Sequence, residues 1–159
     1  MRSYQVFAAM SPERATEIMQ VLSDEAPGVY VQAVATASAA MKARPVYLMK
    51  QPPEKRANAV RRALSRVAAN PVAGEILAVY FLECRKNLLT EWLDLTGLEH
   101  DEGTLAEDAP AQPEKKKLEA AADAFISVDD DADRPLLLAS FAAQEAIEWP
   151  DLDARIADV

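Results

Sequence analysis

Apolar residues recur every three or four positions along most of this chain, the spacing of one face of an amphipathic helix. Several of these stretches begin with proline and glutamate, as at Pro12-Glu13, Pro53-Glu54 and Pro113-Glu114. Proline suits the first helical turn because its missing N–H has no partner there, and glutamate suits the positive end of the helix dipole. The predicted helices span about residues 12–25, 29–43, 53–69, 71–96, 114–127 and 134–148. The pattern therefore predicts an all-α protein.

The predicted helix over residues 71–96 is apolar on more than one face. Its residues at spacings of three and four are Leu77, Phe81, Cys84, Leu88, Trp92 and Leu95. A helix with so broad an apolar surface should be central and contacted by neighbours on several sides, and Gly97 is a suitable left-handed residue to end it. The helical hairpin expected over residues 114–159 is too small to be stable alone, so it should dock on the rest of the chain or on a partner.

The expected architecture is an irregular bundle of about six helices, with the C-terminal hairpin docked on the long central helix. Its parts are an N-terminal helical core at 1–98, an acidic linker at 99–113 and the hairpin at 114–159, together forming one folding unit. Residues 4–9 and 46–49 are ambiguous, and pairing of the two as strands would make the class α+β. The 31 alanines and four glycines favour helices, because alanine is the best helix former and sheets need glycine at turns.

Charge is unevenly distributed along the chain. The net charge is −9, but residues 1–70 carry +5 and residues 71–159 carry −14. An acidic protein is a poor general binder of nucleic acid, because phosphates must be neutralised by clustered cations. The single cysteine, Cys84, excludes an intramolecular disulfide and suits a reducing compartment. No apolar run has the length of a membrane span or a signal peptide, so we expect a cytoplasmic protein with no membrane partner.

The main candidate site is the basic face of the helix predicted over 53–69. Lys55, Arg62 and Arg66 fall within about 40° of one another on a helical wheel. Such a stripe could bind a phosphate, another anionic ligand or an acidic partner helix, or it could be a solvated face paired with this protein's own acidic half. A helix-turn-helix is not expected, because the connection from Pro45 to Pro53 is too long and too rigid for its turn.

Two tryptophans form a second candidate site. Trp92 and Trp149 could line an apolar groove, where tryptophan is a frequent anchor for a partner. Alternatively, both could seal the junction between the C-terminal hairpin and the long helix.

The remaining motifs do not predict a metal site or a catalytic site. Asp129, Asp131 and Asp133 match the first ligands of a calcium loop, but Arg134 stands where that loop needs glycine. His100 is the only histidine and lies among consecutive loop residues, so no convergent metal or nucleophile site is expected around it. We therefore predict no catalytic residues, no metal and no cofactor.

These observations favour a non-enzymatic helical domain that works through protein contacts, as a scaffold or by self-association. Complementary charge would steer and orient its partner. The alternative is a small binder of anionic ligands, or an enzyme acting on one, that uses Lys55, Arg62 and Arg66.

Overall fold

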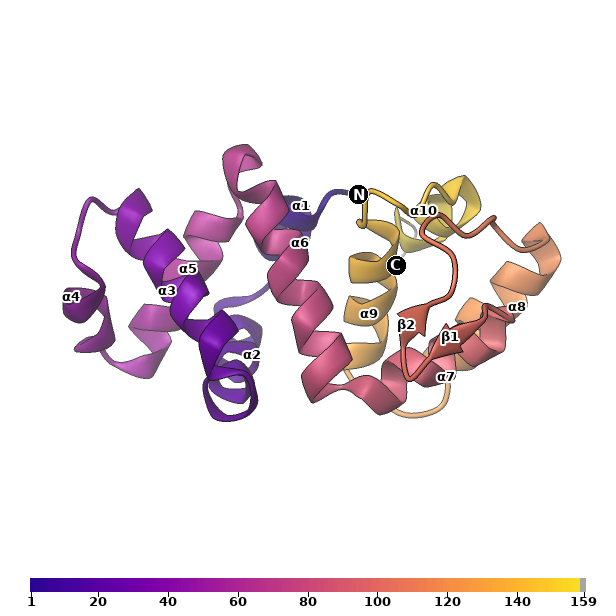
Figure 1. The fold of residues 1–159 in the computed structure, drawn as a ribbon, viewed down its shortest axis with the longest axis horizontal. Coiled ribbons are helices and arrows are strands. Elements are labelled where there is room, and N and C mark those ends of the chain that lie inside the picture. Colours follow the sequence, from indigo (N-terminus) through magenta and orange to yellow (C-terminus); the bar gives the residue numbers. More distant parts are fainter. Residues whose placement is uncertain (158–159) are drawn as a thin grey trace. The chain divides into compact units, whose positions relative to one another are not determined.

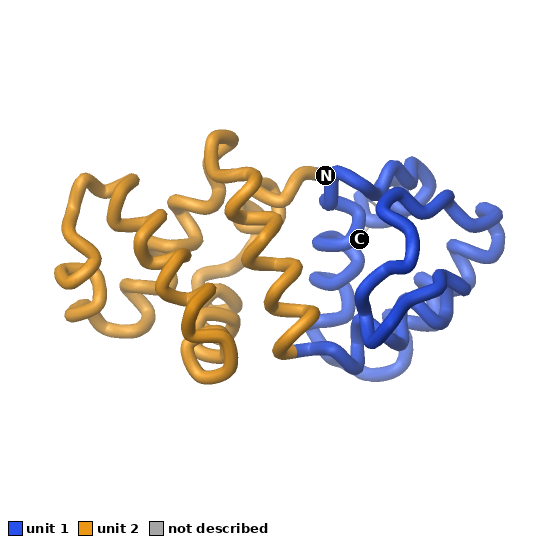
Figure 2. The backbone as a smooth tube through the Cα atoms, in the orientation of Figure 1, with its two compact units in different colours: residues 1, 85–159 blue, residues 2–84 orange. Residues whose placement is uncertain are grey.

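The computed structural model of this protein describes residues 1–157 and confirms the all-helical class (Figure 1). Helices account for 71% of the chain and strands for 3%. The backbone divides into two compact units, coloured separately in Figure 2. Unit 2 is residues 2–84, and unit 1 is Met1 together with the residues from Arg85 onward. The division falls at Arg85, whereas the sequence suggests a linker at 99–113.

Unit 2 contains the first six helices. They are α1 (Ser3–Ala9), α2 (Pro12–Glu25), α3 (Pro27–Ala40), α4 (Pro45–Met49), α5 (Pro53–Leu64) and α6 (Asn70–Val79). The predicted starts at Pro12 and Pro53 are confirmed, and Pro27 and Pro45 begin two more helices. α5 packs against α1, α2 and α3, while α6 packs against α1 and α3. The apolar face of α5 is buried at Ala57, Val60, Ala63 and Leu64.

Residues 4–9 and 46–49 are helical, so the α+β alternative does not hold. In α1, Val6 and Phe7 are buried together with Met10 just beyond the helix, a spacing that only a helix brings to one side. In α4, Pro45 occupies the first turn and Leu48 is the one fully buried residue.

The prediction of a single long helix over residues 71–96 is wrong. α-Helical hydrogen bonding ends at Val79, a π-helical segment η2 (Tyr80–Cys84) follows, and a new helix α7 (Lys86–Thr96) begins after Arg85. Arg85 adopts φ −134° and ψ 40°. These angles lie outside the helical region, so the helix is interrupted at this residue. Gly97 ends α7 in the left-handed conformation with φ 74°, as predicted.

One stretch of unit 2, Val67–Cys84, is long and apolar enough to cross a membrane by length and composition alone. A third of it is buried, and it includes the 3-10 turn η1 (Val67–Ala69) as well as α6 and η2. Its segments pack against α1, α2 and α3 within unit 2.

Unit 1 is built around α7. Its other elements are the hairpin strands β1 (His100–Asp101) and β2 (Thr104–Leu105) and the helices α8 (Lys115–Ile126), α9 (Asp133–Ala142) and α10 (Pro150–Ala157). α7 packs against α8 and α9, and α10 packs against the same two helices. The stretch 99–113 is not a featureless linker, because it carries the antiparallel hairpin and its Pro110 is buried against Trp149.

Candidate functional site

Two of the three predicted cations lie on one helix, and the third does not. Lys55 and Arg62 are exposed on α5, opposite its buried apolar face. α5 ends at Leu64, and Arg66 has extended backbone angles of φ −88° and ψ 143° before the η1 turn. The predicted helix over 53–69 is therefore five residues too long in its α-helical part, and Arg66 leaves the stripe although it remains exposed.

None of these three cations forms an ion pair or a side-chain hydrogen bond with another described residue of unit 2. Their neighbours differ. Arg56 donates Nη1 to the carbonyl oxygens of Met49 at 2.9 Å and Gln51 at 3.2 Å, which ties α5 to the end of α4. Arg61 is similarly engaged by the side chain of Asn58 and the carbonyl of Met10. Arg56 and Arg61 therefore join parts of unit 2, while the side chains of Lys55, Arg62 and Arg66 stay unpaired within that unit.

The spacing of the two α5 cations limits what they could hold together. Lys55 and Arg62 are seven residues apart, which is almost two full turns and about 10 Å along the helix axis. Their Cα atoms therefore lie on one line along the helix. An extended acidic surface matches this separation more directly than one small anion does.

Both tryptophans lie in the core of unit 1. Trp92 is 0% exposed and Trp149 1% exposed. Ring centroids lie 5.6 Å apart for Trp92 and Phe125, 6.0 Å for Trp92 and Phe141, and 5.2 Å for Phe141 and Trp149. This continuous aromatic core joins α7, α8, α9 and the start of α10. It favours the sealing role of the tryptophans, because neither ring reaches the surface to line a groove.

The aspartates around the start of α9 bind an arginine and stabilise the turn before the helix. Asp129 Oδ1 accepts from Arg134 Nε at 2.9 Å, and Asp131 Oδ1 accepts the backbone N–H of Asp133 at 2.9 Å. Asp133 accepts from Arg85 Nε at 2.7 Å. The carboxylates that suggest a calcium loop are thus occupied within the protein. The described residues contain no group of three or more potential metal ligands placed to bind one ion.

Arg134 is the most enclosed cation among the described residues of unit 1. Its guanidinium also bonds both carboxylate oxygens of Glu91 on α7 and the carbonyl of Phe125, and lies 4.8 Å from the centre of the Phe125 ring. The hydrogen bonds that Arg134 donates to Glu91, aided by Asp129, outweigh burial and raise the pKa of Arg134 above its ordinary value. This cation is fully used in packing and offers no binding site.

His100 is fixed by both ring nitrogens. Nε2 lies 2.7 Å from Asp94 Oδ1, and Nδ1 accepts the backbone N–H of Gly103 at 3.1 Å. Because Nδ1 accepts, the neutral ring carries its proton on Nε2 and donates it to Asp94. Neither nitrogen is left to take a proton from a substrate. The pair anchors the β-hairpin to α7 and does not form a general base.

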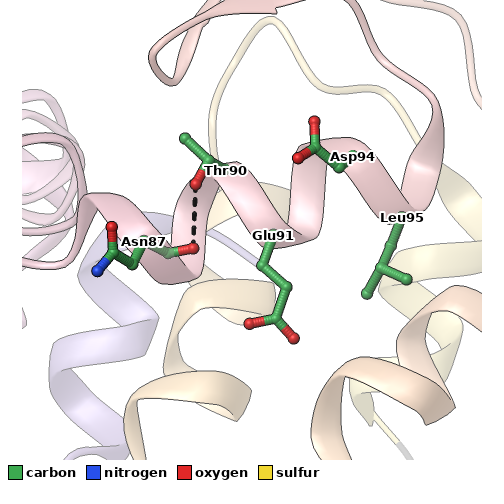
Figure 3. Close-up of a pocket in the computed structure, with 5 residues that line it drawn as sticks. All are labelled: Asn87, Thr90, Glu91, Asp94 and Leu95. Carbon is green, nitrogen blue, oxygen red and sulfur yellow. Dashed lines mark hydrogen bonds between the residues drawn. The ribbon is translucent and has the colours of Figure 1, made fainter.

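Two surface hollows lie beside these residues in unit 1. One, of about 560 Å³, is lined by α7 residues Asn87, Thr90, Glu91, Asp94 and Leu95. Figure 3 shows Glu91 and Asp94 pointing away from each other across α7. The other, of about 600 Å³, is lined by Asp94 of α7 and by residues of the following segment and hairpin as far as Ala106. Glu91 is bonded to Arg134 and Asp94 to His100, so these two carboxylates do not form a facing pair for acid–base chemistry.

A further exposed surface is missing from the sequence-based candidates. It lies at the end of α3 and along α4, where Val46, Tyr47 and Met49 project from the segment that is ambiguous in sequence. The available signal was the absence of any aspartate or glutamate between Glu25 and Glu54 in a chain with 26 acidic residues.

The fold and these sites define an all-helical protein of two units, with cations on one helix face that are unpaired within unit 2. No family model matches the sequence, and no curated protein and no solved structure is significantly similar to it.

Proposed function

We propose that this protein is a non-enzymatic cytoplasmic interaction domain that binds an acidic surface of a protein partner through Lys55 and Arg62 of α5, with Arg66 beyond the helix. The observation that carries the proposal is that these side chains are exposed and unpaired in unit 2, while the neighbouring arginines are bound to backbone carbonyls. Unpaired cations on a rigid helix supply long-range attraction and orientation for an acidic partner.

The separation of the cations supports a macromolecular partner. Two charges about 10 Å apart along one helix match carboxylates that are likewise spread along an element. Because both cations are exposed, salt screens their attraction to a partner. The affinity for the partner should therefore fall steeply with ionic strength.

A second copy of this chain is one such partner. Residues 2–84 carry ten Lys/Arg and seven Asp/Glu, whereas residues 85–159 carry seven and nineteen. The basic face of unit 2 in one copy is therefore complementary in charge to unit 1 of another. Such a contact could be made twice across a two-fold axis, which gives a closed dimer, or head-to-tail, in which case assembly grows with concentration.

The experiment compares two variants with the same change of charge. Lys55→Gln, Arg62→Gln and Arg66→Gln together remove the proposed face, and Lys115→Gln, Lys116→Gln and Lys117→Gln remove three exposed lysines from unit 1. We expect the first variant alone to lose its partners in affinity purification at low salt. Sedimentation velocity of the same proteins shows whether self-association is lost with them. Equal losses in both variants, or none in the first, would reject the proposed face.

The alternative function is binding of a small anionic ligand, and one observation favours it. Arg62 and Arg66 are four residues apart at the end of α5, and both are exposed and unpaired. A thermal-shift screen with phosphorylated metabolites tests this. A shift that is lost in Arg62→Gln and kept in Lys55→Gln would favour the small ligand over the extended acidic partner.

A further inference from the structure

The end of α3 and the whole of α4 form an exposed apolar surface in unit 2. Met41 is 49% exposed, Val46 62%, Tyr47 55% and Met49 44%. Leu48 alone is fully buried in α4, at 1%. We call Met41, Val46, Tyr47 and Met49, with the cations described below, the α4 tip. Large apolar side chains gathered in this way usually mark a site that another surface covers.

The orientation of α4 explains this exposure. With 100° of rotation per residue, the side opposite Leu48 is occupied by Val46 and Lys50, with Tyr47 and Met49 on either flank. α4 lies at one end of unit 2 (Figure 1), and it is joined to the unit mainly through α3. The α4 tip therefore projects outward instead of lining a hollow.

Three cations surround these apolar side chains. Lys42, Arg44 and Lys50 are exposed, and none of them pairs with an acidic side chain among the described residues of unit 2. No acidic residue occurs from Ala26 to Pro53. An anionic surface that approaches the α4 tip meets apolar groups and positive charge, and the chain segment that forms the tip contains no carboxylate to repel it.

We propose that the α4 tip binds peripherally to an anionic lipid surface. Val46, Tyr47 and Met49 would enter the boundary between headgroups and acyl chains, where short apolar projections lose contact with water. Lys42, Arg44 and Lys50 would remain at the headgroup phosphates, their long stems lying along the apolar boundary. Tyrosine suits this depth because its ring is apolar and its hydroxyl stays hydrated.

This inference concerns contact with the membrane surface, and so it revises the expectation of no membrane partner without requiring a spanning helix. The remaining acidic charge of the chain is screened beyond about 8 Å at physiological ionic strength, so the local charge of the α4 tip decides the approach.

Other occupants fit less well. Two copies joined symmetrically through the α4 tip would place Lys42, Arg44 and Lys50 against the same cations of the other copy, which is unfavourable. A protein partner would need a groove shaped for a projecting helix, whereas a lipid interface adapts to it. The inference does not depend on the proposed role of α5, because it uses different residues.

The test is cosedimentation of the full chain with vesicles of phosphatidylcholine, with and without phosphatidylserine. We expect binding only where phosphatidylserine is present, and release by high salt. Replacing Lys42, Arg44 and Lys50 with glutamine should weaken partitioning roughly 100-fold, at about fivefold for each cation. Val46→Ser with Tyr47→Ser should weaken it at least about tenfold.

Two controls separate this result from the proposed function. The glutamine variant of Lys55, Arg62 and Arg66 should still bind vesicles, and Val128→Ser changes an equally exposed valine of unit 1 without effect. Unchanged circular dichroism and Tm show that the tip variants fold. No binding by the folded protein, or binding unaffected by the tip variants, overturns the inference. Loss of a protein partner in the tip variants, with no vesicle binding by the wild type, would assign the α4 tip to that partner instead.

Discussion

The guanidinium of Arg134 is held by the carboxylate of Glu91 through two parallel hydrogen bonds, Nη1 to Oε1 at 2.9 Å and Nη2 to Oε2 at 3.1 Å. The pair joins the start of α9 to the middle of α7. Close by, Arg85 before α7 bonds Asp133 at the start of α9. Unit 1 thus connects these two helices through ion pairs in both directions, beside its aromatic core.

Replacing Glu91 with alanine should lower the free energy of unfolding by about 2 kcal/mol. The cause is the buried guanidinium, which would lose two hydrogen bonds and keep those to Asp129 and Phe125. Urea unfolding followed by circular dichroism measures the change. Glu145→Ala, at an exposed carboxylate with no ion pair among the described residues, is the matched control and should change stability little. The double variant Glu91→Leu, Arg134→Met should be less destabilised than Glu91→Ala alone, and additive losses would contradict the pairing.

The contribution of Arg134 should not depend on pH in the ordinary range. Its pKa is raised in the folded protein, so its stabilisation is complete below the ordinary arginine pKa and is lost only as pH rises through the still higher folded value. The difference in unfolding free energy between wild type and Arg134→Met should therefore stay constant from about pH 7 to about pH 10.5. Arg134→Lys should lose stability relative to wild type towards the upper end, because lysine titrates near about 10.4. A parallel decline in the wild type would disprove this account.

The two buried tryptophans should respond differently to removal of the indole N–H. Trp149 Nε1 donates to the carbonyl of Pro110 at 2.9 Å, whereas Trp92 Nε1 has no acceptor among the described residues. Trp149→Phe leaves that carbonyl without its donor, so it should lower unfolding free energy by about 1–2 kcal/mol more than Trp92→Phe. Urea unfolding of both variants, followed by circular dichroism, gives the comparison. Equal losses would mean that the hydrogen bond adds nothing beyond ring packing.

Gly97→Ala should lower unfolding free energy by about 1 kcal/mol because φ is 74° at this position. An added Cβ would also lie 2.9 Å from Lys117 Nζ, but that side chain can move away. The double variant Gly97→Ala, Lys117→Ala should therefore regain almost nothing. Gly28→Ala is the opposite case, since its helical site in α3 has no atom within 4 Å of the new methyl group, and it should gain about 0.5–1 kcal/mol. Recovery in the double variant would assign the loss at Gly97 to steric contact instead of backbone conformation.

His100→Ala should loosen the β-hairpin without melting α7. The Gly103 amide donates to His100 Nδ1, so amide hydrogen exchange at Gly103 should accelerate roughly tenfold while α7 amides are unchanged. Nitrogen chemical shifts of the ring should show the proton on Nε2 at neutral pH. A proton on Nδ1 would contradict the assigned hydrogen bond.

Helix starts are the part of the fold most readable from sequence. α2 runs over Pro12–Glu25 and α5 begins at Pro53, both as predicted, because a proline at the first turn and an apolar period are local properties. The end of α5 is less readable. The α-helix stops at Leu64, although residues 65–69 contain no proline or glycine to signal it.

Some residues of the candidate site can likewise be predicted from the sequence, and others cannot. Lys55 and Arg62 follow from helical spacing alone, and the structure places them on one exposed face. Helical spacing also predicts Arg66 on that face, but the helix ends at Leu64, before this residue. Trp92 and Trp149 are equally compatible with a groove or a core in the sequence. Only their contacts with Phe125 and Phe141 decide for the core.

The helical class, the first residues of several helices and the concentration of acidic charge in the second half can be predicted from the chain alone, because these depend on period, proline chemistry and composition. Which charges are paired depends on the folded arrangement. Arg134 and Lys55 are both cationic residues in the sequence, yet Arg134 is enclosed by carboxylates and Lys55 is exposed. Such a difference arises from contacts between residues distant in the chain. No local pattern encodes the break at Arg85 or the exposure of α4 either, because each depends on what packs against the backbone at that point.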